Sequence, residues 1–345
     1  MDNRQTIDNL KGEVDFRRKL SKQQVEGQHI FDDEFDRAGI EVVLRERMET
    51  TSRHIRSLID KNFVISPYVE IGAERCQRSM VMETDLNAGG AAVDLSFDML
   101  KSADYYKDVF KKQLPLRICA DLNHAPFKTG SIPFVFCYQT LHHFPDPAPI
   151  VAEVHRFIAP GGVFFFAEEP FKRGFHLSLY KTDKAFSTQH RDRGVLRKAL
   201  DHLFADLTCN EVEHGVIEND DIPLKVWRKT LAVFDRKDIR LVSINRIASD
   251  LDESVILPKR LFNSFWGGEI TGTCYKAGKL EHSTGSILDA LACPVCLASG
   301  KESDLKCAPD AFICQECGVQ HPVKDGVVFL MEPELRGRIY PEILI

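Results

Sequence analysis

The sequence predicts an α/β protein in which helices cover both faces of a parallel β-sheet, followed by a small cysteine-bearing module. Two observations predict this class. From residue 64 onward, short apolar runs that suit strands alternate with longer runs that suit helices, and such alternation is typical of parallel sheets with helical crossovers. Near the C-terminus, two C-x-x-C pairs mark a module of different composition.

Composition and charge limit the function classes. Of the 345 residues, 43% are hydrophobic and 28% are charged, which is typical of a globular chain with one large and one small domain. A net charge of −6 provides no overall basic field for nucleic acid. The N-terminus lacks the apolar run of a signal peptide, and no stretch reaches the ~20 apolar residues of a membrane helix. We therefore expect a cytoplasmic protein without a membrane partner.

Three units are expected along the chain. Residues 1–63 are charged, with apolar side chains at helical spacing, which predicts a helical arm packed on the main domain or serving as a lid. The strand–helix alternation predicts one domain over 64–284. A polar, glycine-containing linker at 276–286 then leads to the cysteine module at 285–345.

The elements of the central domain follow in order. Strands are expected at 68–71, 91–94, 116–119, 133–138 and 162–167, and helices at Phe97–Phe110 and Pro149–Phe157. A less regular stretch follows Pro170. Its expected elements are a helix at Leu224–Phe234 and strands at Asp238–Ile244 and Glu269–Tyr275.

The first strand leads into the most informative segment, Tyr68–Cys76, which reads YVEIGAERC. A strand that ends in a glycine turn and opens a helix is the place where open α/β sheets bind adenine cofactors. Only Gly72 remains of the usual three glycines, because Glu74 and Cys76 stand where small residues are normal. Alone, the segment is also compatible with an ordinary strand-to-helix turn.

Four later segments carry residues that suit the same cofactor site. Asp94 ends the second strand, where a carboxylate can accept hydrogen bonds from two ribose hydroxyls, and Asp121 follows the third, where a carboxylate can accept from an adenine amine. The segment 134–147 ends the fourth strand in a loop with two histidines, and 159–170 gives a Pro-Gly-Gly turn into an apolar strand. Each could be a helix cap, a turn or packing, but their order indicates a cofactor site.

On these motifs, residues 68–170 resemble the core of class I S-adenosylmethionine (SAM)-dependent methyltransferases, typified by those of ubiquinone and menaquinone biosynthesis. VEIGA, AVDLSFDML, ADLNHAPF and LHHFPDP…EVHRFIAPGGVFFF carry the resemblance. It implies a Rossmann-like seven-stranded sheet, with 238–244 and 269–275 as the closing antiparallel hairpin, and makes 64–284 the SAM-binding domain.

The resemblance also implies the roles of individual residues. Glu70, Gly72 and Ala73 would lie under the methionine moiety of SAM, with Glu74 pointing away or contacting its amino group. Asp94 would hold the ribose and Leu95 would flank the adenine. Asp121 and Leu122 would contact the adenine, and Gln139 would lie near the methionine or sulfonium.

His142 and His143 are the candidate catalytic residues. Methyl transfer to a hydroxyl or a protonated nitrogen needs a base for the acceptor's proton, and histidine titrates near neutrality. We expect His142 to serve as this base, oriented by Asp146 or Glu169.

A basic stretch at 171–200 suggests the class of acceptor. It holds eight Lys and Arg residues against two acids, with His176 and His190 in addition. The eight are Lys172, Arg173, Lys181, Lys184, Arg191, Arg193, Arg197 and Lys198, and the acids are Asp183 and Asp192. The stretch is compatible either with a solvated helix face or with a phosphorylated or carboxylated small-molecule acceptor.

The C-terminal module predicts a structural zinc site at Cys293, Cys296, Cys314 and Cys317. Two C-x-x-C pairs separated by seventeen residues suit a tetrahedral Cys₄ ion, and four protein ligands leave no open position. Cys307 is left over. The following GVQHPVKDGVVFLM resembles small zinc-ribbon proteins that stabilise methyltransferases acting on tRNA, rRNA and release factors, with His321 where those have an aromatic. The excess of acids over bases in 285–345 disfavours nucleic-acid binding by the ribbon.

The function expected is therefore methyl transfer from SAM to an anionic small molecule, with O- or N-methylation favoured. Three alternatives stay open: a degenerate scaffold or regulator with the same fold, a methyltransferase for RNA or protein, and a dehydrogenase that binds a dinucleotide in the same place.

Overall fold

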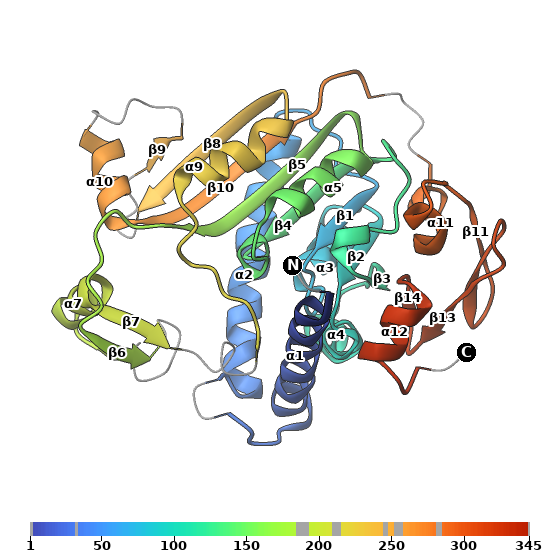
Figure 1. Cartoon of the computed structure of the whole chain (residues 1–345), viewed down its shortest axis with the longest axis horizontal. Coiled ribbons are helices and arrows are strands. Elements are labelled where there is room, and N and C mark those ends of the chain that lie inside the picture. Colours follow the sequence, from blue (N-terminus) through green and yellow to red (C-terminus); the bar gives the residue numbers. More distant parts are fainter. Residues whose placement is uncertain are drawn as a thin grey trace.

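A mixed β-sheet runs through the computed structural model, with helices on both of its faces (Figure 1). The structure describes residues 3–31, 34–183, 193–208, 215–243, 248–251, 258–280 and 285–343. None of the helices within these ranges has the length and apolar character needed to cross a lipid bilayer.

The centre of the sheet consists of five parallel strands. In spatial order they are β3 (Leu116–Cys119), β2 (Gly90–Asp94), β1 (Tyr68–Ile71), β4 (Ile132–Tyr138) and β5 (Ile158–Phe171). The chain therefore builds outward from β1 on one side and then continues with β4 on the other. Such a reversal of strand order opens a crevice at the carboxyl ends of β1 and β4, where open α/β sheets bind their ligands.

Antiparallel strands complete this half of the sheet. β10 (Gly268–Tyr275) lies between β5 and β8 (Arg236–Ser243) and is antiparallel to both, which confirms the expected closing hairpin. β9 (Ala248–Asp250) adds to the outer edge of β8. A separate two-stranded sheet contains β6 (Tyr180–Asp183) and β7 (Ala205–Thr208).

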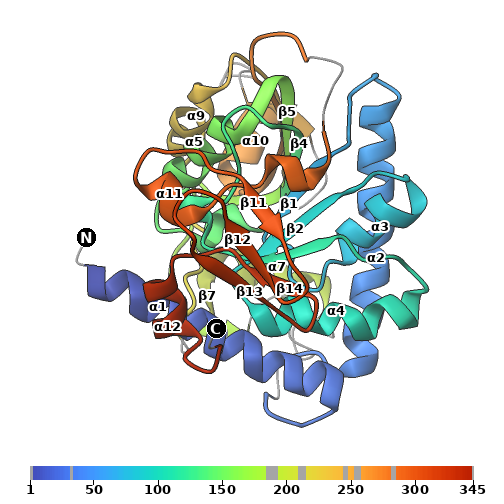
Figure 2. The same cartoon turned by 90° about the vertical axis from the view of Figure 1, so that its right-hand side faces the viewer.

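The sheet has twelve strands among the described residues, and the expected number of seven was wrong. The C-terminal module joins the same sheet through β14 (Val327–Phe329), which is parallel to β3 and places Val328 opposite Ile118. Figure 2 shows the strands of the module facing the viewer. The module continues outward with β13 (Gln320–Lys324), β12 (Ala311–Cys314) and β11 (Leu305–Cys307). An edge strand such as β3 has unpaired backbone groups that another strand can satisfy, and neither segment's own pattern reveals this pairing.

Helices pack on both faces of the sheet because successive side chains of a strand such as β1 point to opposite faces. Val69 and Ile71 lie in a hydrophobic cluster with α5 (Ala148–Phe157) and α9 (Leu224–Thr230). Tyr68 faces the other side, where α2 (Arg37–Ile59) contributes Ile55. The same side carries α3 (Gln77–Asp85) and α4 (Phe97–Phe110).

The N-terminal arm forms α1 (Asn3–Ser21), a π-helical turn η1 (Lys22–Glu26) and α2. Val14 of α1 packs in one cluster with Leu44 and Met48 of α2 and with residues of α3 and α4. The arm therefore lies against the main domain. The other short helices in the described ranges are η2 (Leu122–His124), η3 (Leu141–His143), α7 (Val195–Phe204), η4 (Leu231–Val233), α10 (Pro258–Trp266), η5 (Ile287–Ala290), α11 (Pro294–Ala298) and α12 (Pro333–Ile339).

Candidate active site

A cavity of about 830 Å³ lies at the carboxyl ends of the central strands. Its lining comes from the loops after β1, β2, β3 and β4, from both helices of the arm, and from residues 217–220. A volume of this size is typical of a small-molecule or cofactor site. The cavity therefore lies where the strand order predicts a ligand.

Gly72 starts the loop that lines one wall, which we call the cofactor loop (Gly72–Cys76). Its φ of +67° is a conformation that L-residues with side chains rarely adopt. A Cβ at this position would also overlap the side chain of Thr140, which follows β4. Two separate constraints therefore require glycine at position 72. One is the backbone conformation, and the other is the close approach of the loop after β4.

Glu74, in the place of a second glycine, turns its side chain toward the N-terminal arm. Its Oε2 lies 2.8 Å from Nη1 of Arg47 in α2, and its Oε1 lies 3.7 Å from Nη1 of Arg17 in α1. Burial alone would raise the pKa of Glu74, but the charges of Arg47, Arg75 and Arg17 hold it well below its usual range. The carboxylate is therefore engaged with the arm and leaves the cavity open.

Asp94 stands at the end of β2 with its carboxylate held by the backbone. Oδ2 accepts a hydrogen bond from the backbone N–H of Glu74 (2.8 Å), and Oδ1 accepts one from that of Ser96 (2.8 Å). Burial raises the pKa of Asp94 to about 6, against the opposing effect of these two bonds. The group thus fixes the cofactor loop to β2 and faces the cavity with its remaining acceptor capacity.

Asp121 follows β3 and caps η2. Its Oδ1 accepts hydrogen bonds from the backbone and side-chain nitrogens of Asn123, at 2.9 and 2.8 Å. Burial would raise the pKa of Asp121, but hydrogen bonds from His124 and Asn123 lower it. An ionised carboxylate therefore lies in the cavity wall beside the buried side chain of Leu122.

The structure brings nine of the eleven expected site residues to this one cavity. They are Gly72, Glu74, Asp94, Leu95, Asp121, Leu122, Gln139, His142 and His143. Glu70 and Ala73 do not line it. The carboxylate of Glu70 accepts hydrogen bonds from the backbone and hydroxyl of Ser79 in α3, and burial raises its pKa to about 7. Ala73 packs in the cluster beneath α2, α3 and α4.

Glu169, at the end of β5, organises the loop that carries the two histidines. Its Oε1 accepts hydrogen bonds from the backbone N–H groups of Thr140 and Leu141, and its Oε2 accepts one from that of His142. Oε2 also lies 3.0 Å from Nδ1 of His142. Burial of His142 lowers its pKa, but the hydrogen bond and charge of Glu169 outweigh this and raise it.

His143 lies beside His142, with ring centroids 4.3 Å apart. Its Nδ1 lies 2.9 Å from the backbone carbonyl oxygen of Ile217, in a segment far along the chain. The next residue, Glu218, brings a carboxylate to the pair: the ligand atoms of His142, His143 and Glu218 all lie within 4.8 Å of one another. We call these three residues the histidine cluster.

Several residues of the lining were missed by the sequence reasoning. They are Arg17, Arg47, Arg78, Glu168, Glu218, Asp220 and Glu269. The arginines of the arm follow an ordinary charged helix pattern. Glu218 and Asp220 belong to an acidic stretch without any motif spacing. No local signal could have identified them, since only the fold brings them to the cavity.

The basic stretch at 171–200 does not line the cavity in the described part of the chain. Lys184, His190, Arg191 and Asp192 lie outside the described residues. Besides the histidine cluster, the side of the cavity after β4 and β5 carries the acidic side chains of Asp146, Glu168, Asp220 and Glu269. The charge that would surround an acceptor here is negative.

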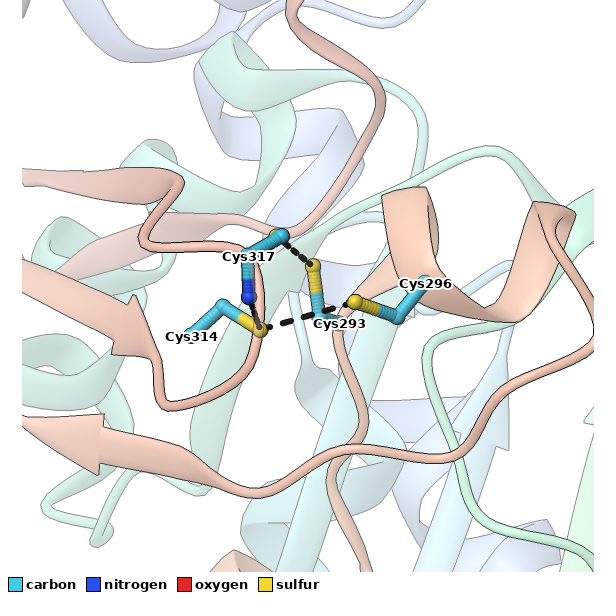
Figure 3. A group of neighbouring side chains, drawn as sticks. All are labelled: Cys293, Cys296, Cys314 and Cys317. Atoms are coloured by element: carbon cyan, nitrogen blue, oxygen red, sulfur yellow. Dashed lines mark hydrogen bonds between the residues drawn. The ribbon is translucent and has the colours of Figure 1, made fainter.

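Four cysteines of the C-terminal module converge on one point (Figure 3). Cys293 and Cys296 flank the first turn of α11, and Cys314 and Cys317 flank the turn after β12. The Sγ atoms of Cys293 and Cys317 are 3.8 Å apart, and those of Cys296 and Cys314 are 3.7 Å apart. Cys307 is exposed and does not belong to the group. Such a cluster could hold one metal ion.

Comparison with known proteins identifies the central region. Residues 70–166 match the family described as methyltransferase domain. A chloroplastic methyltransferase of Arabidopsis thaliana is 33% identical over 85 residues, 24% of this chain and 24% of that protein. The ubiquinone biosynthesis O-methyltransferase of Methylococcus capsulatus is 32% identical over 106 residues, 29% of this chain and 41% of that protein. Residues 70–166 are thus similar to a methyltransferase domain, and the chain matches less than half the length of these relatives.

A solved structure matches part of this chain at low sequence identity. It is a chain from the complex between the Haloferax volcanii Trm112 methyltransferase activator and a methyltransferase, which has 16% identity and a TM-score of 0.39 over 69% of this chain and 94% of that chain.

Proposed function

We propose that the chain transfers the methyl group of SAM to a small-molecule acceptor through an oxygen or nitrogen atom of that acceptor. The observation that supports this proposal most directly is the convergence of nine expected site residues on one cavity of about 830 Å³. Their positions at the ends of β1 to β4 are those at which an open α/β sheet binds an adenine cofactor.

The residues present fit SAM. Asp94 would hold the ribose hydroxyls, Asp121 the adenine amine, and the apolar side chains of Leu95 and Leu122 the faces of the adenine. Arg17, Arg47 and Glu74 form a mixed-charge group beside Gly72. Such a group matches an amino acid moiety, because arginine binds carboxylates and a carboxylate binds an ammonium.

When bound, SAM supplies a methyl group already activated by its sulfonium. The chain has to align the acceptor, exclude water and activate the reacting atom. His142 and His143 are the side chains of the cavity best suited to act on the acceptor, since Glu169 and the Ile217 carbonyl fix their rings. The acidic lining around them would repel a bare anion, so an anionic acceptor requires a cation beside it.

For the C-terminal module we propose a structural zinc site at Cys293, Cys296, Cys314 and Cys317. Tetrahedral zinc with Zn–S bonds of about 2.3 Å needs sulfurs about 3.8 Å apart, and two of the Sγ pairs lie 3.8 and 3.7 Å apart. Four thiolates close the coordination sphere, which suits a structural ion. The pairing of β14 with β3 supports a role of this ribbon in stabilising the methyltransferase domain.

Isothermal titration of the full-length, zinc-loaded chain with SAM and with its demethylated product tests the central proposal. We expect saturable binding of both at one site per chain. A scaffold without catalysis is the competing function, and it predicts no transfer of a labelled methyl group from SAM to any component of a small-molecule extract. Failure of both ligands to bind to the folded protein would overturn the proposal.

A further inference from the structure

We propose that the histidine cluster, His142, His143 and Glu218, binds a divalent metal ion that holds the acceptor through two adjacent oxygen atoms. The acceptor part rests on the proposed methyl transfer, whereas the metal site stands on the geometry of the cluster alone. The three ligand atoms lie within 4.8 Å of one another in the cavity. Two imidazoles and one carboxylate are a donor set that binds first-row transition metals and leaves coordination positions open.

The hydrogen bonds behind the two rings are those of metal-binding histidines. Nδ1 of His142 lies 3.0 Å from Oε2 of Glu169, and Nδ1 of His143 lies 2.9 Å from the carbonyl oxygen of Ile217. A carbonyl oxygen only accepts hydrogen bonds, so Nδ1 of His143 carries the proton. Metal-ligating histidines almost always donate their second nitrogen to a carboxylate or carbonyl in this way. Nε2 is then the nitrogen that each ring can offer to an ion.

Glu169 is held in a position from which it orients the ring of His142. It is fully buried, and it accepts three backbone N–H bonds besides its contact with His142. Three donors from one turn hold the carboxylate as an anion in a fixed position. The ring of His142 therefore has one orientation. Preorganisation of this kind supports ligation, because a metal site requires ligands held in place before the ion arrives.

The charges around the cluster favour a cation. Asp146, Glu168, Asp220 and Glu269 line the same cavity. Arg78 also lines it and lies 3.6 Å from Glu168, so these two charges offset each other and Asp146, Asp220 and Glu269 remain in excess. A cavity with this excess of acids attracts a divalent ion and repels an anion that arrives alone. The ion would thus reconcile an acidic lining with a phosphorylated or carboxylated acceptor.

A bound ion would also replace the general base. Coordination lowers the pKa of a bound hydroxyl, as it does for bound water. The acceptor hydroxyl would release its proton to solvent, and its oxygen would form a bond to the methyl carbon. The carbon–sulfur bond of SAM breaks with its electron pair remaining on sulfur. In this arrangement Nε2 of His142 ligates the ion and cannot also take a proton.

Manganese titration of the full-length, zinc-loaded chain, followed by electron paramagnetic resonance of free Mn²⁺, tests the site. Mn²⁺ prefers carboxylate and imidazole ligands to thiolates, so the cysteine cluster does not compete. We expect one Mn²⁺ per chain, and a loss of affinity of about tenfold or more in His143→Ala and in Glu218→Gln. His155→Ala, at a histidine of α5 that does not line the cavity, is the matched control and should bind as the wild type does. Absence of saturable binding, or unchanged binding in both cluster variants, would overturn the metal site.

A ligand pair tests the acceptor class. 3,4-Dihydroxybenzoate presents adjacent oxygens and benzoate does not. We expect the first to bind the Mn²⁺-loaded chain about tenfold more tightly than the Mn²⁺-free, zinc-loaded chain, a factor set by chelation, and the second to show no difference. Equal binding of 3,4-dihydroxybenzoate with and without Mn²⁺ would overturn chelation. SAM titration of the Mn²⁺-free, zinc-loaded chain separates the two proposals. SAM binding without Mn²⁺ binding removes only the metal site, and the reverse removes only methyl transfer.

Discussion

Nη1 of Arg47 lies 2.8 Å from Oε2 of Glu74, and this ion pair joins the N-terminal arm to the cofactor loop. Arg17 of the other arm helix approaches the same carboxylate at 3.7 Å. Glu74 occupies a position where related cofactor loops have glycine, so the arm supplies the cations that a carboxylate in this place requires. The arm is thereby part of the cavity wall.

Arg47→Met should weaken SAM binding about tenfold. Charged hydrogen bonds contribute roughly 1.5–3 kcal/mol, and about 1.4 kcal/mol corresponds to a factor of ten. In a cavity with excess acids, the loss of this cation leaves Glu74 without its nearest partner and removes a group that suits the carboxylate of methionine. Isothermal titration measures the change. Arg53→Met, on an exposed position of the same helix, is the control, and equal affinity of the two variants for SAM would contradict the assignment.

Asp94→Asn should raise the Kd for SAM by about tenfold, because an amide offers one acceptor where a carboxylate offers two. Burial raises the pKa of Asp94 to about 6. The wild-type affinity should therefore fall as the pH is lowered from 7 to 5, since the protonated form no longer accepts from both ribose hydroxyls. The variant should show a smaller dependence over the same interval. Titrations at four pH values decide this, and parallel curves for the two proteins would refute the ribose assignment.

Glu70→Gln should stabilise the fold at high pH and leave SAM affinity unchanged. Burial raises the pKa of Glu70 from 4.5 to about 7, so folding opposes its ionisation. Its contribution to stability is complete below pH 4.5 and is lost as the pH rises through 7. The glutamine retains an acceptor for Ser79 without a charge. At pH 8 the variant should gain about 3 kcal/mol relative to the wild type, and at pH 4.5 nothing.

Urea denaturation at the two pH values provides the measurement for Glu70→Gln. SAM titration of the same variant tests the second half of the prediction, since Glu70 does not line the cavity. A tenfold loss of SAM affinity would show that Glu70 supports the cofactor loop more directly than its bonds to α3 indicate. An equal gain in stability at both pH values would exclude ionisation as the cause.

The sequence predicted those parts of the fold and site that depend on local order. Asp94 and Asp121 each follow a strand, and parallel strands bring their carboxyl ends to the same edge of a sheet. Their meeting in one cavity could therefore be predicted from a strand pattern alone. The helix at Phe97–Phe110 was predicted with its observed bounds, because Ser96 caps its first turn and its apolar residues recur at helical spacing.

The parts that the sequence did not predict depend on contacts between distant segments. Arg47 and Glu218 reach the cavity from the arm and from a loop without a motif. β14 pairs with β3 although more than two hundred residues separate them in the chain. Each of these strands could equally be the edge of a sheet, so the residue pattern does not reveal which strand pairs with it. The acidic surroundings of His142 likewise arise from four separate segments. Long-range placement of this kind follows from packing and not from local propensity.

Cys314→Ser should release the metal of the C-terminal module and lower the thermal stability of the whole chain. A serine hydroxyl is a poor zinc ligand, and structural zinc contributes to folding free energy directly. Loss of the ribbon would uncover the β3 edge, because β14 pairs with it. Metal analysis and calorimetry measure the two effects. Cys307→Ser, at the exposed cysteine outside the cluster, should change neither. A full metal complement in Cys314→Ser would contradict the assignment.

Gly72→Ala should abolish SAM binding and destabilise the chain, for two separable reasons. The φ of +67° costs a residue with a Cβ about 1–2 kcal/mol. In addition, the new methyl group would overlap the side chain of Thr140, and the two loops that frame the cavity would have to move apart. The double variant Gly72→Ala/Thr140→Gly removes the overlap but keeps the backbone cost. It should therefore recover part of the SAM affinity, while its thermal stability stays below that of Thr140→Gly alone. If Gly72→Ala bound SAM as the wild type does, the close approach of the β1 and β4 loops would not be a requirement of the site.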